Sequence, residues 1–492
     1  MAESATMTPG RSRFGVSLPL LFGLLVYAQV LSKAGAVLHD PDTYWHIAVG
    51  RWIIGHGAVP DHDVFSFSMP GAPFIPPEWL AEVLIAWLYD HFGWAGLVAT
   101  TAFCLAAALA LLLRLLLRGL EPVHATIATA LAWILALTHA LARPHIFALP
   151  ILIWWIAALV AARSEDRAPS IWLAALMILW ANLHSSYMFG LGVAALLAGE
   201  AVILAPDWRA RRLAARGWAL FGILSIGAAL ITPFGVEGLM LPFTLVRMSY
   251  SLAVITEWRS PDFQQYQPLE LWIIFVLFAA LSRGWRLPPI RVGIVVLLLH
   301  MALQHGRYAE LLGFVAPLLL APALAPQLKA RPGGAAVPLI DRGIAELAKP
   351  ASALGIACAA ALVLALSAAA LPGAAPQKDW TPAAALAAVA ERHVEGPVLN
   401  DYNFGGYLIF SGIKPFIDGR YFYGDAFIKR YVEATQAVTN ELPQLLSEYG
   451  ITWTLLPPDR PAVVLLDRLP GWRRLYADDV AVVHVREDQA AR

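Results

Sequence analysis

The sequence has little charge and almost no cysteine. Charged residues make up 14% of its 492 positions and hydrophobic residues 59%, whereas a soluble domain has about 25% charged residues. The 35 basic and 35 acidic residues cancel, so no overall positive field indicates nucleic acid as a partner. Cys104 and Cys358 lie in separate apolar runs and offer neither a disulfide framework nor a CxxC metal site. This composition excludes an ordinary cytosolic enzyme.

Glycine-rich phosphate-binding patterns are also missing. Neither GxGxxG nor GxxxxGKS/T occurs in the chain, which disfavours nucleotide binding. The chain instead contains apolar runs that approach or exceed ~18 residues, the length that indicates a membrane-spanning helix. We predict eleven spans, near residues 15–37, 93–117, 124–141, 144–162, 169–183, 187–205, 217–233, 268–283, 288–304, 307–325 and 351–371.

This pattern predicts two domains. Residues 1–371 would form an α-helical polytopic membrane domain, and residues 378–492 a soluble α/β domain. If the N-terminus is cytoplasmic, the inside loops hold 17 of the 23 Lys and Arg residues of positions 1–371, as the positive-inside rule requires. The odd number of spans then places the C-terminal domain on the extracytoplasmic side.

The loops predicted to lie outside carry polar residues close to the membrane. These residues are His39, Asp40, Asp42, His46, Asp61, His62, Asp63, Glu78 and Glu82 in the first loop, and Arg143, His145, Asn182, His184, Glu257, Arg259, His305, Arg307 and Glu310 in four later loops. Ionisable groups at membrane depth are costly and usually face a cavity or a partner. The one-sided set therefore predicts a polar cavity there, and the alternative is that each residue is simply solvated in its loop.

The first outer loop is the most informative stretch. Apolar residues recur at helical spacing between Thr43 and Gly55, which predicts a helix along the membrane surface. A second such helix is expected after Pro76 and Pro77, because proline suits a first helical turn.

The segment Asp40-Pro41-Asp42 comes directly before the first of these helices. Its two carboxylates could bind a divalent cation such as Mg²⁺ or Mn²⁺ through oxygen. Alternatively, one carboxylate could take a proton from an attacking hydroxyl. The third interpretation is that both residues cap the end of the interfacial helix.

Together these features resemble the GT-C superfamily of polytopic membrane glycosyltransferases, which includes the oligosaccharyltransferases and takes sugars from polyprenyl-phosphate carriers. The resemblance covers most of residues 15–325. It rests on Asp40-Pro-Asp-Thr-Tyr-Trp-His-Ile, Gly50-Arg-Trp-Ile, Val59-Pro-Asp, Phe65-Ser, Glu78-Trp-Leu-Ala-Glu, Arg143-Pro-His-Ile-Phe, Asn182-Leu-His, Glu257-Trp and His305 with Arg307. It implies an enzyme of the bacterial inner membrane that transfers sugar from a polyprenyl-phosphate donor to a glycan, lipid or protein acceptor of the cell envelope.

The resemblance also implies roles for the outer-loop residues. Asp40 or Asp42 would act as the base or orient the acceptor. The lipid phosphate needs positive charge or a metal, which Arg143, Arg259 and Arg307 would supply as cations, while His145, His184 and His305 would donate hydrogen bonds or ligate a metal. The other substrate-binding candidates are His39, Trp45, His46, Glu78 and Glu257. For Trp45 the alternative is an aromatic of the membrane interface, and for Arg259 and Arg307 it is a structural salt bridge.

The C-terminal region alternates predicted helices and strands. We expect helices over 382–393 and 424–448 and strands over 397–401, 414–420 and 452–457, followed by a final hairpin, which predicts a small, mainly parallel sheet. Asp401, Asp418 and Arg420 would then lie at the carboxyl ends of strands, where such sheets bind ligands. They would bind an acceptor or glycan, or else form a buried ion network that holds the loops.

Two other functions remain open at this point. A transporter or flippase for a lipid-linked sugar would usually show repeated halves and polar residues in mid-span, and we find neither in the sequence. A non-catalytic relative would act as an assembly partner, with the C-terminal domain as its binding module.

Overall fold

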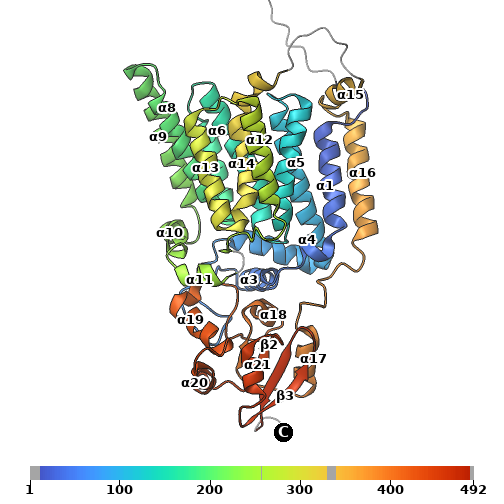
Figure 1. Ribbon diagram of the computed structural model, residues 1–492, viewed down its shortest axis with the longest axis vertical. Coiled ribbons are helices and arrows are strands. Elements are labelled where there is room, and N and C mark those ends of the chain that lie inside the picture. The colour runs from blue at the N-terminus through green and yellow to red at the C-terminus, as the bar shows by residue number, and fades with distance from the viewer. Residues whose placement is uncertain (1–10, 256–257, 330–338, 488–492) are drawn as a thin grey trace, which may run out of the picture.

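The computed structural model describes residues 11–255, 258–329 and 339–487. Most of these residues are helical, and four short strands near the C-terminal end form one small sheet. Apolar helices stand side by side in a bundle at one end of the molecule, and the sheet with its own helices lies at the other end (Figure 1).

The helices of the bundle follow the predicted apolar runs. They are α1 (Leu18–Leu31), α2 (Ala34–Val37), α4 (Trp79–Leu116), α5 (Pro122–Ala136), α6 (His145–Ser164), α7 (Ala175–Leu183), α8 (Tyr187–Ile203), α9 (Trp208–Ala229), α12 (Pro268–Arg283), α13 (Pro289–Gln304), α14 (Ala309–Leu328) and α16 (Ala353–Ala370). The helix that covers the predicted span near 217–233 is α9, and it begins earlier, at Trp208. Asp207 caps this helix by accepting the N–H of Ala210 at 2.8 Å.

Five helices among the described residues are long and apolar enough to cross a membrane. They cover Trp79–Leu116, Pro122–His139, His145–Ser164, Gly306–Leu328 and Ala353–Ala370. Five more apolar helices have 10–17 residues, which is short for about 30 Å of hydrocarbon. The number of spans, eleven, stays a prediction.

The two helices predicted for the first outer loop are present between the bundle and the sheet (Figure 1). The first is α3 (Asp42–His56), and the second is the first half of α4. Gly93 separates this half from the apolar half of α4, because its backbone has φ 61° and ψ −156° within the helix. A positive φ of this kind favours glycine. The break at Gly93 therefore lets the chain change direction between the two helical segments of α4, where the predicted span begins.

Three short helices were not predicted from the sequence. They are α10 (Gly235–Leu245), α11 (Ser249–Val254) and α15 (Leu339–Leu347). The N-terminal end of α11 is held by a residue of the C-terminal region, since Asp425 accepts the N–H of Tyr250 at 3.1 Å and that of Ser251 at 2.9 Å. The segment after α10 is thus fastened to the C-terminal region as well as to the bundle.

The C-terminal sheet has the strand order β1-β2-β4-β3. Its elements are α17 (Ala383–Glu391), β1 (Val398–Asn400), α18 (Gly405–Phe410), α19 (Gly424–Thr435), α20 (Glu441–Glu448), β2 (Trp453–Leu456), α21 (Pro461–Leu466), β3 (Trp472–Ala477) and β4 (Val482–Arg486). Strands β1 and β2 are parallel, whereas β4 is antiparallel to both β2 and β3. The prediction of a mainly parallel sheet is therefore wrong.

The predicted strand at 414–420 is also absent, for a local reason. The side chain of Asn400 accepts the N–H of Phe416 at 2.7 Å and donates to the carbonyl of Ile417 at 2.7 Å. A side chain thus satisfies backbone groups that a neighbouring strand would otherwise pair. The long helix predicted over 424–448 ends at Thr435 and resumes at Glu441.

Buried apolar side chains form separate clusters in the two parts. Trp155 and Trp180 are fully buried in the bundle, and Leu399 and Leu456 are fully buried beside the sheet. The division into domains 1–371 and 378–492 stays a prediction.

Replacing Gly50 is expected to weaken the packing of α3 on α4. A Cβ atom there would lie 2.0 Å from the carbonyl oxygen of Glu82, whereas a Cβ atom at Gly55 of the same helix would meet nothing within 4 Å. We predict that Gly50→Ala lowers the stability by about 1–3 kcal/mol, and that Gly55→Ala leaves it unchanged or raises it by about 0.5–1 kcal/mol. Thermal unfolding in detergent measures both, and equal effects would contradict this packing.

Candidate active site

The segment Asp40-Pro41-Asp42 forms the turn between α2 and α3. Asp40 is 1% exposed and accepts the backbone N–H of Thr43 at 3.2 Å and its hydroxyl at 2.9 Å. It therefore holds the start of α3, as one of the interpretations of the sequence expected.

Arg143 links the two carboxylates of this segment. Its Nε and Nη2 atoms donate to Asp40 at 2.8 and 2.5 Å, and Nη2 also donates to Asp42 at 2.7 Å. Burial alone would raise the pKa of Asp40, but the charge of Arg143 and the hydrogen bonds outweigh it, so the pKa is lowered from 3.8. Arg143 stands just before α6, so this contact joins α6 to the start of α3.

Asp42 is the more accessible of the two carboxylates. Its side chain is 19% exposed, against 1% for Asp40, and both residues line a cavity. The other Asp42 oxygen accepts the indole N–H of Trp45 at 3.0 Å. Asp42 is therefore held in a fixed orientation while it remains open to a ligand.

A divalent cation bound by both carboxylates, one of the alternatives left open by the sequence, does not fit this arrangement. All four carboxylate oxygens of Asp40 and Asp42 already accept hydrogen bonds, and Arg143 supplies the positive charge between them. Within the described ranges no group of three or more His, Cys, Asp or Glu side chains is arranged to hold a metal ion.

Histidine and glutamate pairs surround this centre. His46 Nδ1 lies 3.2 Å from Glu82 Oε1, and its ring packs on Trp45 at 3.7 Å between centroids. Burial, with a smaller effect of Arg143, holds the pKa of His46 well below 6.5, so the ring is neutral near pH 7. His184 Nε2 lies 3.1 Å from Glu78 Oε1. These pairs connect α3 and the end of α7 to the residues around Trp79, where α4 begins.

A cavity of about 1570 Å³ brings most of the predicted residues together between the bundle and the C-terminal region. The predicted site residues that line it are His39, Asp40, Asp42, Trp45, His46, Glu78, Arg143, His145, His184, Arg259, Arg307, Asp401 and Arg420. Asp418 and His305 do not belong to its lining, and Glu257 lies outside the described residues.

Two arginines of the later outer loops also line the cavity and make contacts of their own. Arg307 lies over the ring of Trp258 at 4.7 Å, and Arg259 donates to the carbonyl of Val254 at 3.2 Å. His305 lies 2.5 Å from the Trp258 carbonyl. His305 therefore contacts the backbone of Trp258, the residue whose ring lies under the Arg307 guanidinium.

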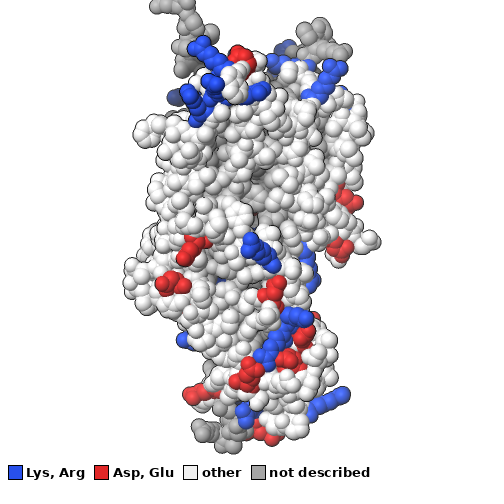
Figure 2. All heavy atoms as spheres, turned by 90° about the vertical axis from the view of Figure 1, so that its left-hand side faces the viewer, with Lys and Arg blue, Asp and Glu red and all other residues white. Residues whose placement is uncertain are grey.

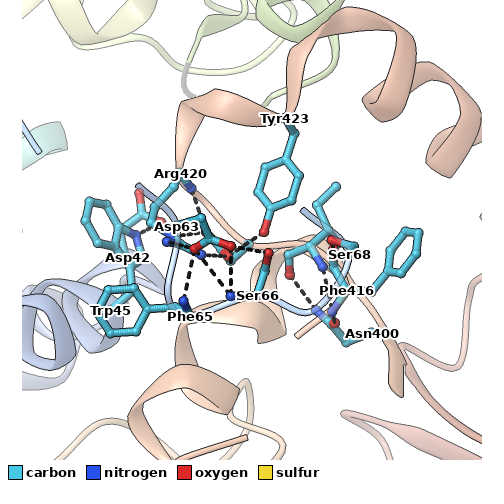
Figure 3. Close-up of polar contacts among 12 residues, drawn as sticks. Asp42, Trp45, Asp63, Phe65, Ser66, Ser68, Asn400, Phe416, Arg420 and Tyr423 are labelled. Carbon is cyan, nitrogen blue, oxygen red and sulfur yellow. Dashed lines mark hydrogen bonds and ion pairs between the residues drawn. The ribbon is translucent and has the colours of Figure 1, made fainter. Parts of the chain in front are cut away.

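Arg420 and Asp418 form a clamp with Asp63 of the first outer loop, and Figure 3 shows Arg420 beside Asp63. Arg420 Nη1 donates to Asp63 at 2.6 Å, and Nη2 donates to Asp418 at 2.7 Å. Tyr423 also donates to Asp418, at 2.6 Å, and all three charged side chains are fully buried. The buried ion network therefore describes Asp418 and Arg420 better than a ligand site does.

Asp401 belongs to a different pair. It follows β1, is fully buried, and accepts from Arg460 Nε at 2.9 Å and from the N–H of Asn403 at 3.0 Å. Arg460 follows β2, so the carboxyl ends of the two parallel strands meet here, as the position of Asp401 predicted. Asp401, Asn403 and Arg460 all line the cavity.

The C-terminal region approaches the Asp40–Asp42 segment at two glycines. A Cβ atom at Gly406 would lie 2.4 Å from the carbonyl oxygen of Pro41, and one at Gly419 would lie 2.1 Å from Asp42 Oδ1. Only glycine fits at such distances. The C-terminal region therefore packs directly against this segment, and residues from both parts of the chain line the cavity.

Several residues of this region were given no catalytic or binding role from the sequence. Glu82 and Glu310 line the cavity, Asp63 completes the clamp, and Arg460 pairs with Asp401. Glu82 and Glu310 belong to the outer-loop set from which the cavity was predicted, and Asp63 lies in the first of these loops. Arg460 could be suspected only from its place after a predicted strand.

Comparison with known proteins gives structural matches only. No family model matches the chain, and no curated protein matches it. The crystal structure of ArnT from Cupriavidus metallidurans in the apo state matches with a TM-score of 0.51 and 12% identity over 94% of this chain and 97% of that one. The same protein bound to undecaprenyl phosphate matches with a TM-score of 0.51 and 13% identity over 95% and 97%. The crystal structure of the Archaeoglobus fulgidus oligosaccharyltransferase in the apo form matches with a TM-score of 0.47 and 10% identity over 89% of this chain and 69% of that one.

The match to ArnT extends over nearly the whole of both chains. The protein therefore has a GT-C-like fold, in agreement with the resemblance seen in its sequence.

The pH dependence of stability tests the Asp40–Arg143 pair. Because the pKa of Asp40 is lowered in the folded state, its contribution is complete above the unfolded value of about 3.9 and is lost as the pH falls through the folded value. We predict that Asp40→Asn unfolds at a lower temperature at pH 7 and loses less stability than the wild type on acidification. Exposed Asp262→Asn is the control, and identical pH profiles for all three proteins would contradict the prediction.

Removing the arginine of the clamp should be far more costly than removing an exposed arginine. Arg420→Met leaves Asp63 and Asp418 buried without their cation, and we expect a loss of about 3–5 kcal/mol. Arg430→Met is the matched control, since this half-buried arginine of α19 pairs with Glu441 and Glu448 near the surface, and we expect a loss of about 0–1 kcal/mol. Thermal unfolding compares the two, and similar losses would argue against the clamp.

Proposed function

We propose that the protein is a membrane glycosyltransferase that moves a sugar from a polyprenyl-phosphate-linked donor to a cell-envelope acceptor. The observation that carries this proposal is the fixed but accessible carboxylate of Asp42 beside Arg143 in one large cavity. The GT-C-like fold supports it, as does the structure of ArnT bound to undecaprenyl phosphate.

The lining of the cavity suits a donor with a lipid tail and a polar head. Apolar residues from α6, α8 and α13 line one part of it, among them Leu152, Val193 and Leu298, and the ion-paired residues line another part. In this arrangement the isoprenoid chain lies among the bundle helices, and the phosphate and sugar lie near Arg143. Arg259 and Arg307, which also line the cavity, are the further cations for the phosphate.

The proposed reaction assigns the base to Asp42. The acceptor nucleophile attacks the sugar carbon that is bound to the lipid phosphate, and Asp42 accepts the proton of that nucleophile. The bond between this carbon and the phosphate oxygen breaks, and the electron pair leaves with the lipid phosphate. Positive charge from Arg143 or Arg307 stabilises the departing phosphate. Asp40, which is buried against Arg143, acts as a positioning residue.

The distribution of charge supports the proposed orientation in the bacterial inner membrane. Figure 2 shows Lys and Arg side chains gathered at the end of the bundle that points away from the sheet. The positive-inside rule assigns this end to the cytoplasm. The cavity and the C-terminal region then face the periplasm, where the donor meets its acceptor.

Asp42→Asn should abolish transfer while the protein stays folded. Loss of a positioned base typically lowers a rate by about 10²–10⁴-fold. The matched control is Asp61→Asn, since Asp61 lies in the same loop and its side chain is 83% exposed. Glycan profiling of a deletion strain that expresses each variant provides the measurement, together with thermal unfolding of the purified proteins.

The same experiment separates the other candidate functions. Normal glycan modification in Asp42→Asn would contradict the proposed role of this residue. A non-catalytic assembly partner would keep its function in the Asp40 and Asp42 double mutant but lose it when residues 378–492 are deleted. A flippase would move labelled lipid between leaflets in proteoliposomes and transfer no sugar.

A further inference from the structure

Two buried carboxyl oxygens of the cavity have no partner. Among the described residues, Glu82 Oε2, Glu310 Oε1 and Trp380 Nε1 are the buried side-chain atoms of cavity-lining residues that make no hydrogen bond. Glu82 is 1% exposed and Glu310 is 5% exposed. A buried acceptor without a donor is unfavourable, so each of these two carboxyl groups has one oxygen that a further hydrogen-bond donor would stabilise.

Both groups contact neighbours of the centre formed by Asp42 and Arg143. Glu82 contacts His46 at 3.2 Å, and the His46 ring packs on Trp45, which donates to Asp42. Glu310 Oε2 lies 3.9 Å from His145 Nε2.

His145 in turn follows Arg143 by two residues. Glu82 is thus connected through His46 and Trp45 to Asp42, the proposed base. Glu310 is connected through His145 to Arg143, which is proposed to bind the phosphate.

Both carboxyl groups lie in closely packed parts of their helices. The carbonyl of Glu82 lies against Gly50 so closely that a Cβ atom there would be 2.0 Å away, which fixes this part of α4 on α3. Glu310 lies in the first turn of α14, and its neighbours Leu312, Gly313 and Phe314 are buried. Neither oxygen meets a donor among the described side chains, and a polar group of a bound ligand can supply one.

From these contacts we infer that Glu82 and Glu310 bind the donor sugar by accepting hydrogen bonds from two of its substituents. This inference rests on the proposed function. Hydroxyl and amino groups share the required chemistry, because each offers a hydrogen to an oxygen acceptor. The sugar therefore lies between α4 and α14, with its phosphate toward Arg143.

Binding of a bare and a sugar-bearing carrier to the full-length protein tests the inference. The probes are undecaprenyl phosphate and the same lipid carrying a hexose, a deoxyhexose or an amino sugar. We expect the wild type to bind at least one sugar-bearing form more tightly than the bare lipid. Glu82→Met and Glu310→Met should each weaken that form by about tenfold and leave the bare lipid unchanged. Preference among the hydroxyl and amino forms identifies the group that is bound.

Two further proteins serve as references in this experiment. Glu165→Met, on the exposed end of α6, should bind like the wild type. Glu82→Gln and Glu310→Gln keep the shape of the side chain and one acceptor oxygen. If a methionine variant does not fold, the glutamine variant of the same residue is measured instead. We expect the glutamine variants to lower affinity for the sugar-bearing lipid less than methionine does.

Three results would overturn the inference. One is a wild type that prefers no sugar-bearing form over the bare lipid. Another is an unchanged affinity for the sugar-bearing lipid in both methionine variants, or in both glutamine variants where these are measured instead. A third is equal weakening of bare and sugar-bearing lipid, which would assign the residues to the carrier or to the fold. If Asp42→Asn still abolishes glycan transfer in any of these cases, the proposed function stands without the inference.

Discussion

The contact of one guanidinium with two carboxylates sets the geometry on which the rest of the site depends. Arg143 joins the N-terminal end of α6 to the turn before α3, and Asp40 in turn holds Thr43 at the start of that helix. The orientation of α3 then places Trp45 and His46. Because an unpaired carboxylate as buried as Asp40 would be strongly destabilising, the turn and the arginine have to be placed together.

A second constraint comes from the C-terminal region. Gly406 and Gly419 leave no room for a side chain against Pro41 and Asp42, and Arg420 reaches into the first outer loop to bind Asp63. Tyr421 adds to this contact, since its hydroxyl donates to the carbonyl of Ile75 at 2.9 Å and burial raises its pKa to about 12. The buried ion pairs that join the first outer loop to the C-terminal region therefore lie where the apolar bundle meets the sheet.

Much of this architecture could be predicted from local sequence patterns. Apolar runs located the bundle helices, and the polar residues of five outer loops indicated a common cavity, which Arg143, His184 and Asp42 now share. Local patterns could not show which residues pair, because Arg143 lies 103 residues from Asp40 and Arg420 lies 357 residues from Asp63. The segment at 414–420 had the composition of a strand, and the side chain of Asn400 is what keeps it out of the sheet. Such long-range contacts show which charged residues form ion pairs, and the spacing of residues in the sequence does not.

The clamp between Asp63 and Arg420 has a consequence for biosynthesis. A ribosome makes Asp63 long before Arg420, so the first outer loop waits for most of the protein to be synthesised before its partner arrives. During that interval the cavity lacks the wall that Gly419 and Arg420 form in the complete protein. In a nascent chain the cavity can therefore be completed only after Arg420 has emerged and its region has reached the loop.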